Sequence, residues 1–212
     1  MKKIFGILFF CLFYGCGSVY QIAPLQDFSF ENGKKIIESN LKNSSVLLEI
    51  AQDNYNTITP LLLKVLAKSK NPILFDSNNI TAYQEGKIFK VLDSHQILHS
   101  NINFTNSLRA FNIPIPPLPI NYYYPNIFYS PFFGFGFGRN YGISDDYFRE
   151  IEYSGSILFA HYLKKTTLKN NIFSGGFIAI VLQDAVEGKI YIKVQIGEEI
   201  HEVGFFLQSQ QK

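Results

Sequence analysis

Apolar and polar residues alternate in the last part of the chain. Residues 188–197 read GKIYIKVQIG, in which isoleucine or valine occupies every second position from Ile190 to Ile196. A period of two is typical of a strand with one buried face. The stretches 175–183 and 201–208 are also strand-like, and the sequence VEGK predicts that the first two strands form a hairpin. The chain is therefore expected to finish in a β-meander.

Short apolar runs separated by turn residues fill residues 45–93. The runs are SVLLEIA, ITPLLLKVLA, NPILFD, NITAYQ and KIFKVLD, and the separators are rich in Asn, Asp, Ser and Gly. Regularly spaced short strands predict a β-sandwich. The second run has a rival interpretation, because Thr59 and Pro60 also form a good helix start. We favour a strand, since the run is short and its neighbours are strand-like.

The composition changes sharply between residues 113 and 142, which contain six of the nine prolines and ten aromatic residues. Proline supplies no backbone donor and glycine packs no side chain, so this segment predicts a long loop rather than a ladder of strands. Ser144 is then positioned to cap a helix over about residues 144–165, with acidic residues in its first turn and lysines in its last.

Residues 17–44 mix polar and apolar side chains without a sustained period. We expect a tether over residues 16–44, in which residues 34–41 can form a short helix. The expected domain is then a β-sandwich over residues 45–208, with the aromatic loop 113–142 inserted into it.

The start of the chain has the layout of a secretory signal peptide. Lys2 and Lys3 precede an apolar run from Ile4 to Tyr14 that is broken only by Gly6. A membrane-spanning helix needs about 20 apolar residues, so this run is too short to span. We therefore expect residues 1–15 to be removed.

The end of this run resembles the lipobox of bacterial lipoproteins. The matching residues are Phe13, Tyr14, Gly15 and Cys16. The resemblance implies that Cys16 receives a diacylglycerol, that the peptide is cut before it, and that its new amino group is acylated. Independently, a cut before Cys16 would remove Cys11 and leave no other thiol, which suits an exported protein. The alternatives are an uncleaved amphipathic anchor and a plain secretory signal with Cys16 as a free thiol.

Charge and composition narrow the function further. The formal charge is +2, and loss of Lys2 and Lys3 would balance acidic and basic residues. Such a chain has no basic field to attract nucleic acid. Aromatic residues make up 16% and charged residues 17%, which is too apolar for general disorder.

The usual catalytic and metal-binding patterns do not match. His95 and His99 have zinc-site spacing, but Gln96 stands where a zincin has glutamate, and no third ligand is evident. The surrounding stretch KVLDSHQILHS also predicts a strand and turn, in which that spacing gives no fixed metal geometry. The glycines of GFGFGRNYG do not fit the dinucleotide fingerprint, and G-x-S-x-G is absent. His161 and His201 have no acid partner that the sequence can nominate. We expect no catalytic residue, no metal, no cofactor and no enzymatic activity.

The aromatic loop is the segment with functional content, because tyrosine-rich apolar surface is typical of interfaces. It could contact a protein partner, a membrane or a glycan. Alternatively, it could fold back over the sandwich or stay partly disordered. The residues concerned are Tyr122, Tyr123, Tyr124, Phe128, Tyr129, Phe132, Phe133, Phe135 and Phe137.

The stretches KSKNPILFDSNNITAY and KKTTLKNNIFSGGFIAIVL are similar to the middle and late strands of immunoglobulin-like sandwiches in exported bacterial lipoproteins. That resemblance implies an immunoglobulin-like domain and no particular activity. We expect a non-enzymatic envelope lipoprotein that binds an envelope protein or serves assembly. The alternative is a small-ligand or glycan-binding module, and the third hypothesis is an unrecognised hydrolase. By resemblance, Gly17 after Cys16 favours the outer membrane, facing the periplasm.

Overall fold

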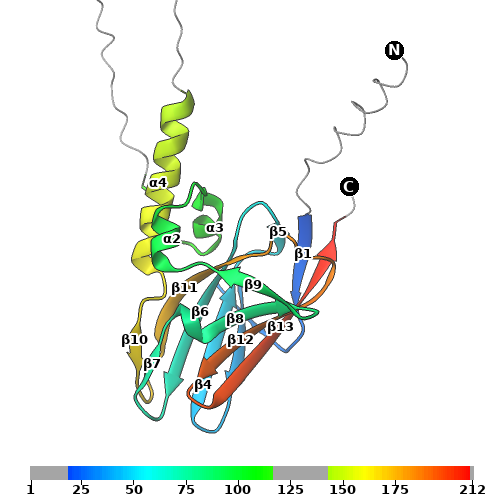
Figure 1. The fold of residues 1–212 in the computed structure, drawn as a ribbon, viewed down its shortest axis with the longest axis vertical. Coiled ribbons are helices and arrows are strands. Elements are labelled where there is room, and N and C mark those ends of the chain that lie inside the picture. The colour runs from blue at the N-terminus through cyan, green and yellow to red at the C-terminus, as the bar shows by residue number, and fades with distance from the viewer. Residues whose placement is uncertain (1–18, 117–142, 211–212) are drawn as a thin grey trace, which may run out of the picture.

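The computed structural model describes residues 19–116 and 143–210. They form a large curled antiparallel sheet with a layer of helices against one side (Figure 1). The expectation of a mainly β protein is confirmed. Within these residues, no helix combines the length and the apolar character needed to cross a membrane.

The strands fall into two halves of the main sheet and one small ribbon. The first half contains β2 (Ser29–Glu31), β3 (Lys34–Asn40), β4 (Ser44–Ile50), β6 (Leu61–Ser69) and β11 (Ser174–Val181). The second half contains β9 (Lys87–Val91), β8 (Ile80–Gln84), β12 (Gly188–Ile196), β13 (Glu199–Ser209), β1 (Val19–Pro24) and β5 (Asn54–Asn56). The ribbon pairs β7 (Ile73–Phe75) with β10 (Thr166–Leu168).

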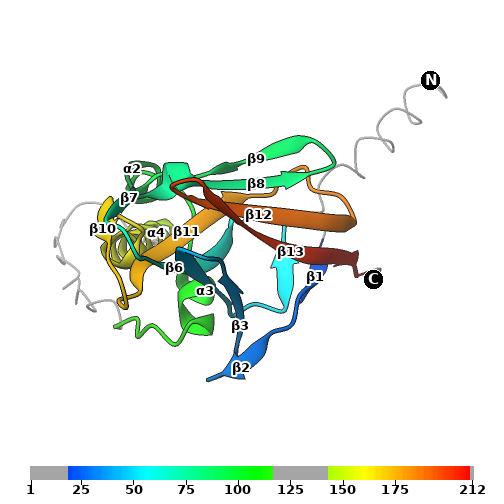
Figure 2. The same cartoon turned by 90° about the horizontal axis from the view of Figure 1, so that it is seen from below.

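The two halves form one sheet in the order β2-β3-β4-β6-β11-β9-β8-β12-β13-β1-β5. The sheet curls so that both halves contribute to one apolar core, as the view from below shows (Figure 2). They are joined through β11 and β9, which share only the pairs Ile180↔Val91 and Val181↔Lys90. The hairpin predicted from VEGK is wrong, because β11 pairs with β6 and β9 whereas β12 pairs with β8 and β13. That connection crosses between the halves.

Strand β6 is buried on both faces of the sheet. Leu61, Leu63 and Val65 point into the core between the halves, whereas Leu62 belongs to a second apolar cluster under the helices. A strand that is buried on both faces reads as a nearly continuous apolar run. The strand interpretation of this run is confirmed, and the helix alternative is wrong.

The helical layer consists of α2 (Ser94–Leu98), α3 (Thr105–Ala110) and α4 (Ile143–His161), and one 3-10 turn, η2 (Ser77–Asn79), precedes β8. Leu108 of α3 and Leu158 of α4 pack with Phe177 of β11 in the second apolar cluster. Gly155 lies against α2, where an added Cβ would be 3.5 Å from the carbonyl oxygen of Ile97. The expected helix over 144–165 exists but ends at His161.

Three expectations for the local structure are wrong. Residues 16–44 were expected to be a tether, yet β1, β2 and β3 lie within them. The helix expected over residues 34–41 is strand β3, which pairs along β4 from Lys35↔Ile50 to Asn40↔Ser45. Conversely, the sequence around His95, read as a strand and turn, forms α2. Its start is fixed by a capping box between Asp93 and Gln96.

The predicted loop 113–142 is described only at its beginning. Ile113 and Ile115 are partly buried and pack against the apolar cluster under the helices. Residues 117–142 lie outside the described residues, as do residues 1–18.

Candidate functional site

Polar residues gather where the apolar inner rows of four strands end together. The inner row of β4 runs from Ile50 to Val46 and finishes at Ser44. In the same way, Ser39 ends the row of β3, Ser69 ends the row of β6, and His201 and Glu199 end the row of β13. We call this end of the sheet the mouth.

The turn between β12 and β13 positions Glu199 and His201. Gly197 takes a φ of +61°, which glycine adopts without strain, and the pair Ile196↔Glu199 closes a two-residue turn. Residues two apart on a strand share a face, so Glu199 and His201 both project toward the first half of the sheet. There they meet Ser39 and Ser44, which lie more than 150 residues away in the chain.

These four side chains form one continuous chain of hydrogen bonds, which we call the seam cluster. The hydroxyl of Ser44 donates to the Glu199 carboxylate, which also accepts from the backbone N–H of Asn43 at 2.9 Å. Nε2 of His201 lies 2.8 Å from Ser44 Oγ, and Nδ1 lies 2.9 Å from Ser39 Oγ. Because an ionised carboxylate can only accept hydrogen bonds, the Ser44 hydroxyl donates its single hydrogen to Glu199. His201 must then donate from Nε2 and accept at Nδ1 from Ser39, which assigns its tautomer.

The environment sets the charges of the cluster. Burial lowers the pKa of His201, while the nearby Glu199 carboxylate partly opposes that effect. The hydrogen bond from Ser44 lowers the pKa of Glu199, helped by the backbone N–H of Asn43. At neutral pH the seam cluster therefore holds a neutral imidazole and an ionised carboxylate.

This arrangement is poorly suited to nucleophilic catalysis by Ser44. A general base must accept the serine proton, but Nε2 of His201 already carries a hydrogen in the assigned tautomer. The Glu199 carboxylate next to Ser44 Oγ would also oppose the negative charge of a tetrahedral intermediate, and the neighbouring N–H of Asn43 is engaged by that carboxylate. The geometry instead fastens β3 and β4 to β13.

A cleft of about 450 Å³ opens beside the seam cluster. Asn43, Ser44 and Ser69 line one side, and the turn with Glu198 and Glu199 lines the other. The Ser69 side chain is only 2% exposed, and its Oγ has no hydrogen-bond partner in the described part of the chain. Buried hydroxyls are normally paired, so this group is an unused donor and acceptor buried in the wall of the cleft.

The site residues predicted from the sequence do not belong to the seam cluster or its cleft. Cys16 and the nine aromatic residues of the loop lie outside the described residues; the aromatic ones are Tyr122, Tyr123, Tyr124, Phe128, Tyr129, Phe132, Phe133, Phe135 and Phe137. His95 and His99 do come together on α2 and its C-cap, with ring centroids 4.3 Å apart, and both are exposed. Across residues 19–116 and 143–210, no three His, Cys, Asp or Glu side chains are placed to hold a metal ion.

Sequence reasoning missed the seam cluster, although part of it was visible. Glu199 lies two residues before His201, where the predicted strand begins, so extending that strand by two residues would have placed both side chains on one face. Nothing in the sequence pairs them with Ser39 and Ser44, because that contact depends on how the sheet curls.

In comparisons with protein-family models, with curated proteins and with solved structures, nothing matches this chain. Function is therefore inferred from its own residues.

Proposed function

We propose that this chain is a non-enzymatic lipoprotein of a bacterial envelope, anchored through acylated Cys16 and acting in protein interaction or envelope assembly. The observation that carries the proposal is the position of β1. The first sheet strand begins at Val19, directly after the lipobox-like residues. Cleavage before Cys16 would therefore remove the whole apolar leader and leave every strand of the sheet intact.

The seam cluster supports the non-enzymatic part of the proposal. At Ser44, the facing nitrogen of His201 already carries a hydrogen and the Glu199 carboxylate lies beside the hydroxyl, so this serine is not activated as a nucleophile. Placement at the outer membrane, facing the periplasm, rests on Gly17 by resemblance.

The proposed interaction segment is the aromatic loop. Helix α4 extends beyond the sheet, and its Ile143 end is the outermost part of the helix (Figure 1). The point where the chain returns from residues 117–142 is thus set apart from the strands. Exposed aromatic residues at such a point would suit contact with an envelope protein.

An immunoglobulin-like form of the sandwich is also part of the proposal. It is supported by the antiparallel pairing of the strands and by the single core between two halves.

Intact mass of the membrane-extracted protein tests the anchor. We expect the parent to begin at Cys16 and to carry the mass of its acyl chains. Cys16→Ser should lose the lipid, whereas Cys11→Ser, the matched control, should give the same mature product as the parent. Parent and Cys16→Ser proteins with the same amino terminus and no lipid would overturn the anchor.

Deletion of residues 120–141 tests the interaction segment. Envelope proteins captured by crosslinking to the parent should be lost from the deletion variant, while its thermal unfolding shows that the sheet still folds. A variant with the nine loop aromatics changed to serine keeps the loop length and should lose the same partners. An unchanged partner set in both variants would reject this role.

A second candidate function is binding of a small hydroxylated or amine ligand in the mouth cleft. The unpartnered Ser69 hydroxyl favours it, because a ligand hydroxyl could satisfy that group while Glu198 and Glu199 attract positive charge. A thermal-shift screen of free sugars and amines tests this function. A stabilising compound should lose its effect on Glu198→Gln and keep it on Glu187→Gln, a surface carboxylate far from the cleft.

A further inference from the structure

The proposed lipid anchor and the described sheet are separated by very little chain. Val19 follows Cys16 by three residues, and three residues span at most about 10 Å. Val19 itself is held in place: its carbonyl accepts from the N–H of Gln210 at 3.0 Å, and it pairs with Asn56 of β5. An acylated Cys16 would thus keep this end of the sheet within about one headgroup layer of the bilayer.

Topology identifies which other segments share this end. Strand β5 is antiparallel to β1, so the residues after Asn56 extend past Val19. Ile58 lies there in an ordered turn, with its N–H donating to Asn56 Oδ1 at 3.0 Å. Its side chain is 68% exposed.

The loop between β11 and β12 lies at the same end. The Tyr20 hydroxyl of β1 donates to the carbonyl of Ala185 at 3.1 Å, which ties this loop to β1. The backbone N–H and C=O of Val186 are both bound by the Gln84 side chain, at 3.0 and 2.8 Å. The Val186 side chain is left 52% exposed.

We infer that the end of the sheet formed by Val19, Ile58 and Val186 rests on the bilayer surface, with the two apolar side chains entering the interface. The inference builds on the acylation of Cys16 that is proposed above. Apolar side chains at a membrane interface bury several ångströms into the boundary between headgroups and acyl chains. Lys87 and Asp184 pair at 3.0 Å near the loop, so the charges here are mixed and a zwitterionic lipid surface suits this end.

The same orientation directs the mouth away from the membrane. Strand β13 runs from Glu199 at the mouth to Ser209, which pairs with Tyr20 beside the anchor (Figure 1). Ten residues of strand span about 33 Å. The cleft beside Ser69 then opens toward the aqueous side, where a ligand could reach it.

Single-cysteine labelling of the acylated protein in phosphatidylcholine vesicles tests this orientation. Ile58→Cys and Val186→Cys report on the proposed membrane-facing end. Ile172→Cys is the matched control, because Ile172 is 58% exposed and follows Asn171, which lines a cavity together with Ser69 at the mouth. With a nitroxide on the lipid headgroup, a fluorophore at positions 58 and 186 should be quenched at least about twofold more than one at 172, because only the first two lie at the interface.

The outcomes separate this inference from the proposal beneath it. Vesicle flotation and intact mass report the anchor, and the quenching pattern reports the orientation. Lipidated protein that floats but is quenched equally at all three positions, or more at 172, would overturn the orientation and leave the anchor standing. Protein that carries no lipid and stays with the soluble fraction would overturn both.

Discussion

Two hydrogen-bonded junctions between distant parts of the chain, the seam cluster and the Tyr162 hydroxyl, contain different chemical groups. The seam cluster joins β3 and β4 to β13 through Ser39, Ser44, His201 and Glu199. At the other junction, Tyr162, the residue after α4, joins Leu92, which follows β9, to Ala179 of β11. Its hydroxyl donates to the carbonyl of Leu92 at 2.5 Å and accepts from the N–H of Ala179 at 2.9 Å.

The two junctions differ in how their stability depends on pH. Burial raises the pKa of Tyr162 far above its ordinary value, so its hydroxyl stays neutral at any physiological pH. The seam cluster contains two groups whose pKa values are lowered by folding, His201 and Glu199. The helical layer is therefore attached independently of pH, whereas closure of the mouth weakens in acid.

Tyr162→Phe should have the largest effect. It leaves the buried carbonyl of Leu92 and the N–H of Ala179 without their partner, and two such groups cost about 2–4 kcal/mol of unfolding free energy. Urea denaturation at pH 7.5 and at pH 5.5 should show the same loss.

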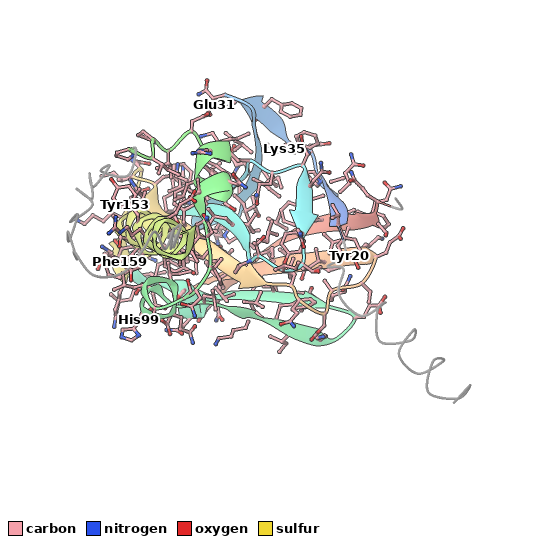
Figure 3. The ribbon with its side chains drawn as sticks, turned by 90° about the horizontal axis from the view of Figure 1, so that it is seen from above. Tyr20, Glu31, Lys35, His99, Tyr153 and Phe159 are labelled. Atoms are coloured by element: carbon pink, nitrogen blue, oxygen red, sulfur yellow. The ribbon has the colours of Figure 1, made fainter. Side chains whose placement is uncertain are left out.

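Tyr153→Phe is the matched control, because Tyr153 lies on the side of α4 away from the strands (Figure 3). Its loss should stay below about 0.5 kcal/mol. Equal losses of unfolding free energy in the two variants would show that the Tyr162 hydroxyl does not stabilise this junction.

His201→Ala should come next, with a loss of about 2 kcal/mol at pH 7.5 from two broken hydrogen bonds and a small cavity. In the parent, the folded state binds fewer protons at His201 than the unfolded state, because folding lowers the pKa of this group. Stability should therefore fall as the pH drops below about 6.5, the ordinary histidine value.

Urea denaturation of both proteins between pH 7.5 and pH 5 measures this difference. The variant lacks the group, so its loss relative to the parent should shrink in acid. A parent and a variant with parallel pH profiles would refute the pH-sensitive seam. Below about pH 4.5, protonation of Glu199 should weaken the parent further, since folding lowers the pKa of that carboxyl too.

Ser44→Ala should cost about 1–2 kcal/mol at pH 7.5. It removes the hydroxyl that links His201 to Glu199 and leaves the buried Nε2–H of His201 without an acceptor. Thermal unfolding measures the effect. A stability equal to that of the parent would show that the hydroxyl is dispensable to the seam.

Ser69→Ala should have the smallest effect, between no change and a gain of about 1 kcal/mol. Ser69 is the direct cross-strand partner of Ser44, but its buried hydroxyl has no partner among the described residues, so removing it ends a desolvation penalty. Comparing Ser44→Ala with Ser69→Ala thus compares the loss of a hydrogen-bonded hydroxyl with the loss of one that makes no hydrogen bond. A clear loss of stability in this variant would indicate that Ser69 is partnered in solution.

The sequence predicted those parts of the fold in which one strand carries its own pattern. Alternation from Ile190 to Ile196 was sufficient to place β12, and all four of its apolar positions are buried. Strand β3 was misread because its core contribution is mainly Ile37, beside the more exposed Ile36. Its conformation is set by pairing with β4, which a local pattern does not contain.

The missed helix α2 teaches a different point. Asp93 and Gln96 have the spacing of a capping box, so a local signal was present and was outweighed by strand-like neighbours. For the seam cluster, the local signal was limited to the spacing of Glu199 and His201, because Ser39 and Ser44 reach them only when the two halves of the sheet meet. Cys16 and the loop aromatics stay predictions.

The position of β1 also decides when this protein can finish folding. Its neighbours are β5 and β13, and pairing with β13 runs from Tyr20↔Ser209 to Pro24↔Phe205. Among the described strands, β1 comes first in the chain and β13 comes last, so their pairing forms only after all the others have been synthesised. Such a long-range closure is intrinsically slow. Until residue 209 has left the ribosome or a translocation pore, one edge of β1 is open to other chains. Premature termination before β13 would leave that edge permanently unpaired.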